Sequence, residues 1–231
     1  EIPNSPWIGS RNYTSVKMKH NCTESNIMDF MNILTGIEVE TFSMTDLTIN
    51  PFALKVIMSM CKNLKVLHLP KLTGENMITV SNPHYPRSTM SVPENFWRNL
   101  PSLDLKELKC NSGSGRTLKL LLASSTESFK FEYVENVDVD LLTNFLKVQK
   151  NLKNLHLRSY HGIDFLTTDT LNKVNFNLKS LKLENIRIPN IQNFYEFINN
   201  HAVTLEHVQL DCMAISLFNN FRSVTKIKKF I

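Results

Sequence analysis

The chain has 231 residues, of which 42% are hydrophobic and 20% are charged, an ordinary composition for a globular protein. No run of eighteen apolar residues occurs, so the sequence predicts no membrane-spanning segment. The net charge of +5 is mildly basic, and no block of five or six like charges is present, which argues against a nucleic-acid-binding arm.

In chain order, the main pattern is a recurring L-x-x-L-x-L unit, clearest at Leu152–Leu157 and Leu178–Leu183. Its last three residues follow the period of two that is typical of a strand. Most copies start about 21–27 residues apart, as in leucine-rich repeats. The copies start at Tyr13, Val39, Leu64, Leu105, Thr126, Leu152, Leu178 and Leu205, and Val224-x-x-Ile227 starts a possible ninth.

Helices are predicted between these strands. Ile27, Phe30, Met31 and Leu34 form one apolar stripe at helical spacing. Asn50-Pro51 is a typical helix start, and Ser91-x-x-Glu94 has the spacing of a capping box. Further apolar runs at helical spacing are 118–122, 141–148 and 194–198.

Strand and helix in alternation predict an α/β leucine-rich-repeat solenoid, a horseshoe of about eight degenerate repeats with a concave parallel sheet and convex helices. The continuous pattern indicates one domain over residues 1–231, with an insertion at about 73–102 where two copies start about 41 residues apart. Neither end resembles a capping unit, so we expect a fragment of a longer chain.

The sequence contains no H-E-x-x-H, G-x-S-x-G or C-x-x-C pattern, so it predicts a protein that is not an enzyme and has no metal or cofactor. His156 with His161, and His201 with His207 and Cys212, lack the spacing of a metal site. The Gly113–Arg116 segment lacks the lysine and hydroxyl of a phosphate-binding loop, which favours a simple turn.

A binding surface is predicted from the alternation of strand side chains. The residue between the last two leucines of each copy points away from the core. This column, here called the ladder, consists of Lys17, Ser43, His68, Lys109, Lys130, His156, Lys182 and Gln209. Two residues further on, a second column contains Lys19, Thr45, Pro70, Asn111, Glu132, Arg158, Glu184 and Asp211.

The ladder contains no acid, and from Lys109 to Lys182, with Arg158 beside it, it predicts a basic stripe. Such a stripe suits an acidic or phosphorylated segment of a protein partner. The alternative is a solvated face whose lysines only confer solubility. The predicted contact residues are Lys109, Lys130, His156, Arg158, Lys182 and Gln209.

The insertion supplies a second candidate surface. Its Asn82–Arg87 segment has two prolines around an aromatic residue and a cation, which favours an exposed, extended loop. Tyr85 and Arg87 are the contact residues predicted there, and a merely tolerated surface insertion is the alternative.

Four separated cysteines without a C-x-x-C pair favour buried thiols and a cytoplasmic or nuclear location. Asn12 and Asn21 match the N-glycosylation pattern, which in so short a form arises readily by chance.

CKNLKVLHL at 61–69, QKNLKNLHL at 149–157 and GSRNYTSVKMKH at 9–20 resemble the repeat region of F-box/leucine-rich-repeat proteins of arthropod type. The resemblance implies a substrate receptor of a cullin-RING ubiquitin ligase, whose repeats hold the protein substrate. The F-box that would bind the ligase adaptor is absent from this sequence. The alternative is an extracellular or innate-immune repeat domain, and neither hypothesis includes a nucleic-acid or membrane partner.

Overall fold

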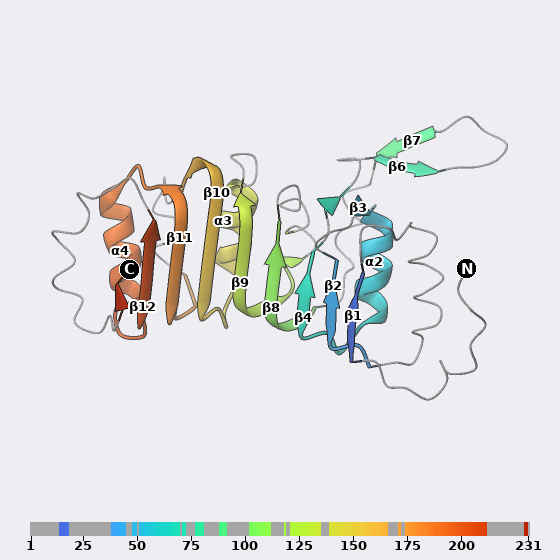
Figure 1. Ribbon diagram of the computed structural model, residues 1–231, viewed down its shortest axis with the longest axis horizontal. Coiled ribbons are helices and arrows are strands. Elements are labelled where there is room, and N and C mark those ends of the chain that lie inside the picture. The colour runs from blue at the N-terminus through green and yellow to red at the C-terminus, as the bar shows by residue number, and fades with distance from the viewer. Residues whose placement is uncertain are drawn as a thin grey trace.

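The computed structural model contains one long parallel sheet in which strands follow one another in chain order (Figure 1). The structure describes residues 14–18, 38–44, 48–49, 51–69, 71–72, 77–80, 88–91, 102–111, 118, 121–134, 139–165, 171, 174–211 and 229–230. The nine strands of this sheet are β1 (Ser15–Lys17), β2 (Thr41–Ser43), β4 (Val66–His68), β8 (Asp104–Cys110), β9 (Ser125–Val134), β10 (Asn154–Asp164), β11 (Ser180–Arg187), β12 (His207–Asp211) and β13 (Lys229–Phe230). The protein is therefore α/β, as predicted.

The predicted alignment of the L-x-x-L-x-L copies is confirmed by the strand register. Leu155 of β10 pairs with Phe129 on one side and with Leu181 on the other, and Leu181 pairs with Val208. Because equivalent residues face each other, their side chains stack in one direction and are almost fully buried.

Three helices are described: α2 (Pro51–Met60), α3 (Val139–Val148) and α4 (Ile191–His201). Each follows a strand, and α2 starts at the predicted proline. Buried apolar residues from each of the three helices, such as Leu54, Phe145 and Phe197, join the same core as the inward strand residues. In Figure 1, α3 lies behind β9 and β10, and the ring of its Phe145 lies 4.8 Å from that of Phe129. The helices therefore pack on the apolar face of the sheet.

The segment between β4 and β8 adds no strand to this sheet, since Leu67 pairs directly with Leu108. It contains β5 (Lys71–Leu72), which pairs with β3 (Thr48–Ile49), and an antiparallel hairpin of β6 (Met77–Val80) and β7 (Ser88–Ser91). Ser91, predicted as a helix cap, ends a strand instead.

Three further details differ from the prediction. Leu118 and Leu121 lie in 3₁₀ turns, although both are buried at the predicted spacing of three. Two copies extend to L-x-x-L-x-L-x-x-L, with Leu47 and Leu72 at the last position, but Leu72 pairs with Ile49, two residues beyond Leu47. In the last strand, Val208 pairs with Phe230, three residues beyond Ile227.

Several predicted features lie outside the described residues: the helix at 27–34, Tyr85 and Arg87, the 113–116 turn, Lys19, Thr45, Pro70, Cys22, Cys212, Asn12 and Asn21. Cys61 and Cys110 are buried in the core, as predicted. Burial raises the pKa of the Cys61 thiol to about 11, which keeps it protonated and unreactive. Within the described part of the chain, no helix has both the length and the apolar character needed to cross a membrane.

Candidate functional site

The ladder lies on the face of the sheet opposite the core, here called the open face. Every neighbouring pair in it, from Lys17 with Ser43 to Lys182 with Gln209, is paired in register. Parallel strands lie about 4.8 Å apart, so these side chains form one continuous row. The structure therefore brings together the six predicted contact residues of β8–β12: Lys109, Lys130, His156, Arg158, Lys182 and Gln209.

The predicted basic stripe is corrected by the side-chain contacts, because two glutamates of the second column neutralise much of its charge. Glu132 lies 3.0 Å from Lys109 Nζ and 2.7 Å from Lys130 Nζ. Glu184 lies 2.5 Å from Lys182 Nζ, 3.6 Å from Arg158 Nε and 3.4 Å from His156 Nε2. We call these seven residues of β8–β11 the charge lattice.

The lattice keeps both glutamates ionised. Partial burial alone would raise the pKa of Glu132, but its contacts with Lys130 and Lys109 outweigh burial and lower that pKa. Lys182 and then His156 have the same effect on Glu184. Four cationic groups against two carboxylates leave a formal surplus of two positive charges, with His156 counted as neutral.

His156 occupies the centre of the lattice, paired with Lys130 on one side and Lys182 on the other. Burial lowers its pKa; Glu184 opposes this effect and the two lysines add to it. The ring is therefore neutral near pH 7, and it separates two ammonium groups without adding a third charge.

His68 extends the polar row toward β2. Its Nε2 lies 2.9 Å from Glu107 Oε1, and its Nδ1 lies 3.2 Å from Ser43 Oγ. A carboxylate only accepts hydrogen bonds, so Nε2 donates to Glu107. Ser43 is buried, so the ladder is not exposed to solvent at this position.

At the carboxyl end of the same face, two tyrosines that the sequence did not single out form a stack. The rings of Tyr133 and Tyr160 lie 3.9 Å apart at an interplanar angle of 12°. Arg158 Cζ lies 5.5 Å from the centre of the Tyr133 ring. The hydrogen bond with Tyr133 raises the pKa of the Tyr160 phenol. We call Tyr133, Arg158 and Tyr160 the tyrosine platform.

Irregular backbone positions this platform. Tyr133 is an extra residue in β9, since Glu132 pairs with Arg158 and Val134 with Ser159. It has φ +65°, which is rare for a bulky side chain. Asn185 in β11 also has positive φ, at +52°, and its Nδ2 donates to Tyr160 O at 2.7 Å and Ser159 O at 3.1 Å.

Replacing Asn185 by Gly should lower the free energy of unfolding by about 1 kcal/mol, because Gly accepts the positive φ but loses both hydrogen bonds. Asn185→Asp, which tolerates the same φ but places a carboxylate against two carbonyl oxygens, should cost at least as much. Chemical denaturation measures both. A Gly variant as stable as the wild type would show that the amide does not hold β10.

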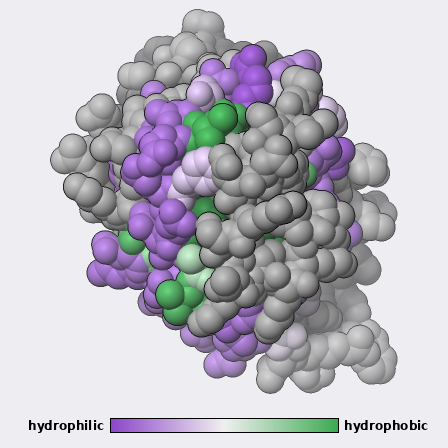
Figure 2. All heavy atoms as spheres, turned by 90° about the vertical axis from the view of Figure 1, so that its left-hand side faces the viewer, coloured by the Kyte–Doolittle hydropathy of each residue, from purple (hydrophilic) through white to green (hydrophobic). Residues whose placement is uncertain are grey.

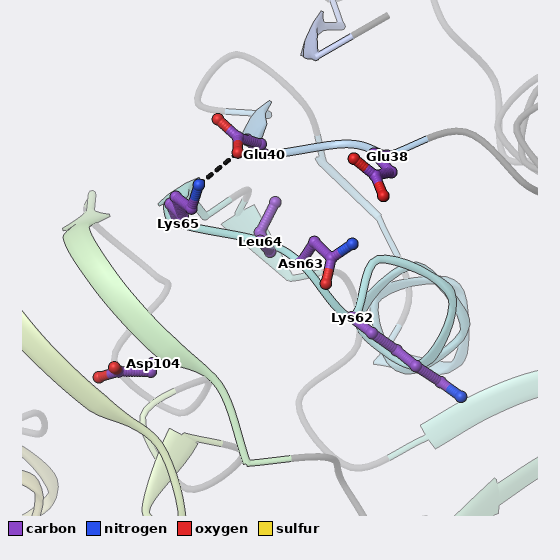
Figure 3. Close-up of a pocket in the computed structure, with 7 residues that line it drawn as sticks. All are labelled: Glu38, Glu40, Lys62, Asn63, Leu64, Lys65 and Asp104. Atoms are coloured by element: carbon purple, nitrogen blue, oxygen red, sulfur yellow. Dashed lines mark hydrogen bonds and ion pairs between the residues drawn. The ribbon is translucent and has the colours of Figure 1, made fainter. Parts of the chain in front are cut away.

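A separate hollow of about 390 Å³ lies at the opposite, amino-terminal edge of β2, β4 and β8 (Figure 3). It is lined by Glu38, Glu40, Lys62, Asn63, Leu64, Lys65 and Asp104. In Figure 3, Lys65 and Glu40 point toward each other and form an ion pair, while the Lys62 side chain extends away from both. Two of its five charges are thus already satisfied within the protein.

Among the described residues, no group of three His, Cys, Asp or Glu side chains is arranged to hold a metal ion. Comparisons with family models, with curated proteins and with solved structures each found no match to this chain.

Proposed function

We propose that this chain is a leucine-rich-repeat protein-binding module that is not itself an enzyme and holds a segment of a protein partner on its open face. By its resemblance to F-box/leucine-rich-repeat proteins, its role is substrate recognition for a cullin-RING ubiquitin ligase in the cytoplasm or nucleus. The adaptor would bind an F-box outside the sequence given.

The observation that carries this proposal is the unbroken register of the ladder on a face without a helix among those described. A parallel sheet is normally covered on both faces. Here the described helices cover one face, and the other carries a partly exposed row of polar side chains, including Lys130 with 35% and Lys182 with 32% of the side chain exposed. A surface of this kind is rigid, repetitive and available to an extended partner.

The test neutralises two ladder lysines, as Lys130→Gln with Lys182→Gln. Neutral replacements are preferable to charge reversal, which would place new carboxylates beside Glu132 and Glu184. The matched control is Lys65→Gln with Lys153→Gln. Each of these lysines is also partly exposed and paired with a glutamate, Glu40 and Glu127 respectively, but lies at the amino-terminal edge of the sheet.

The wild-type chain should capture a defined set of proteins from its natural source. The captured amount of these proteins should fall about tenfold with the ladder variant, because each lost contact is worth about 0.5–1 kcal/mol, and it should be unchanged with the control variant. Both variants should melt within a few degrees of the wild type. If the two variants capture the same proteins equally well, the open face is not the binding surface.

A further inference from the structure

The carboxyl end of the open face is more specialised than the ladder requires. A ladder needs only regular strands, yet β9, β10 and β11 each depart from regular geometry at neighbouring positions. Tyr133, Gly162 and Asn185 all have positive φ, between +52° and +68°. Positive φ is strained at a bulky residue such as Tyr133, and such strain is concentrated at functional sites.

This irregular backbone supports an aromatic surface that is already formed in the absence of a partner. Tyr160 continues the outward alternation of His156 and Arg158 along β10, so it lies on the open face. Its ring rests on Tyr133, but 60% of the residue is exposed to solvent. Asn185 fixes the backbone at Tyr160, and Ser159 Oγ donates to Val134 O at 2.9 Å to tie β10 to β9.

Large exposed aromatic rings on a rigid support are typical anchors of protein interfaces, since Tyr contributes much contact area with little loss of conformational entropy. Figure 2 shows the end of the molecule that carries β12 and α4, where hydrophilic residues predominate among the coloured atoms and hydrophobic residues form only small groups. On the open face, where the charge lattice adjoins the platform, a few aromatic anchors would supply most of the binding energy.

The charge lattice lies beside the platform, and its net charge indicates which kind of partner segment can bind there. Its four cationic groups exceed its two carboxylates, which favours an acidic segment. Asp211, on β12 beside Glu184, carries the opposite sign. A bound acidic segment should therefore extend from the platform toward Lys130 and Lys109, and the carboxylate of Asp211 disfavours its extension toward β12. The carboxylates of Glu132, Glu184 and Asp211 also disfavour a continuous polyanion such as single-stranded nucleic acid.

We propose that the tyrosine platform is the anchor subsite of the open face, where it stacks against an aromatic side chain within an acidic segment of the partner protein. This inference rests on the proposed function and deepens it, since it names the partner's chemistry and the place where it is held. Stacked aromatic pairs are worth about 0.5–1.5 kcal/mol beyond the area they bury.

The experiment uses fluorescently labelled synthetic decapeptides titrated to about 1 mM, so that binding with a Kd up to about 1 mM is detected. One is glutamate-rich with a central tryptophan, the second replaces that tryptophan by alanine, and the third keeps the tryptophan in a lysine-rich sequence. The glutamate–tryptophan peptide should bind most tightly. Tyr160→Ala should weaken the binding of this peptide about three- to tenfold and leave the binding of the alanine peptide unchanged. Tyr160→Phe, which keeps the stack, should bind within about twofold of the wild type.

Four outcomes would overturn the anchor: no binding of the glutamate–tryptophan peptide by the wild type, equal binding by Tyr160→Ala, tighter binding of the lysine-rich peptide, or tighter binding of a single-stranded oligonucleotide of ten bases. The proposed function is decided separately by the capture experiment. If the Lys130→Gln, Lys182→Gln pair weakens both acidic peptides but Tyr160→Ala weakens neither, the open face binds protein and the platform does not anchor it.

Discussion

Replacing Gln149 by Leu should lower the free energy of unfolding by about 2–3 kcal/mol, although Leu is apolar and similar in size. The Gln149 side chain is fully buried. Its Oε1 accepts from Thr126 N at 3.0 Å, and its Nε2 donates to Ser124 O at 3.2 Å and Phe145 O at 3.3 Å. Leu would leave the buried N–H of Thr126 without this acceptor, and an unsatisfied buried donor costs about 1–3 kcal/mol.

The matched control is Gln192→Leu, at an exposed glutamine whose Nε2 bonds only to Glu196 at 3.1 Å. That change should alter stability by less than about 0.5 kcal/mol. Urea denaturation with an unchanged m-value measures both. Equal stability of the two variants would show that water, and not Gln149, satisfies the start of β9.

The second large effect concerns His201, which is buried in the core without a hydrogen-bond partner at either ring nitrogen. Its ring stacks on Phe176 at 5.4 Å and meets Phe197 edge-on at 4.8 Å. Burial among these rings lowers its pKa from 6.5 to about 4. Below about pH 6.5 the His201 imidazole therefore binds a proton in the unfolded chain, whereas in the folded protein it binds this proton only near pH 4.

By linkage, the contribution of His201 to stability is complete above about pH 7 and is lost as the pH falls from about 6.5 to 4, for a total of about 3 kcal/mol. His201→Phe should remove this dependence. The difference in unfolding free energy between variant and wild type should grow by about 2 kcal/mol in favour of the variant between pH 7 and pH 5.

The control for His201 is His207→Phe, at an exposed histidine on β12. Its unfolding free energy should follow the pH dependence of the wild type. Denaturation curves collected across this pH range decide the matter. If the wild type and His201→Phe lose stability in parallel on acidification, the buried imidazole is not the group that takes up the proton.

The ladder could be predicted from the sequence because it depends only on a period of two and on the recurrence of one apolar unit. Leu155, Leu181 and Val208 define the register, and His156, Lys182 and Gln209 then have to lie next to each other on the other face. The first copy aligned as predicted, since Val16 pairs with Phe42, but the repeat spacing failed at the last strand, where Phe230 replaces Ile227 beside Val208. Val224, Ile227 and Phe230 are spaced three apart, so more than one alignment of this strand fits the repeat pattern.

The pairing of the ladder lysines with glutamates could have been predicted from the sequence. Lys130 with Glu132 and Lys182 with Glu184 are two residues apart on the same strand face, a spacing that brings opposite charges together. Considering the ladder column by itself, without its neighbouring column, led to the expectation of an unpaired basic surface.

The tyrosine platform could not be predicted in this way. Tyr133 is displaced from strand alternation by an extra residue, and a bulky side chain at positive φ has no signal in composition or periodicity. Asn185 and Gly162 are residue types that tolerate such backbone, but that tolerance is permissive and does not indicate which aromatic side chains come together.

The serial order of the main sheet bears on how the chain assembles during synthesis. Each strand pairs with the previous strand of this sheet, at separations of 21–27 residues apart from the step from Val66 to Glu107. A growing chain can therefore add strands one at a time as they leave the ribosome, without waiting for distant partners. Only at β8 must the nascent chain extend through the whole β5–β7 segment before docking, which makes this junction the step with the largest loop-closure cost in the main sheet.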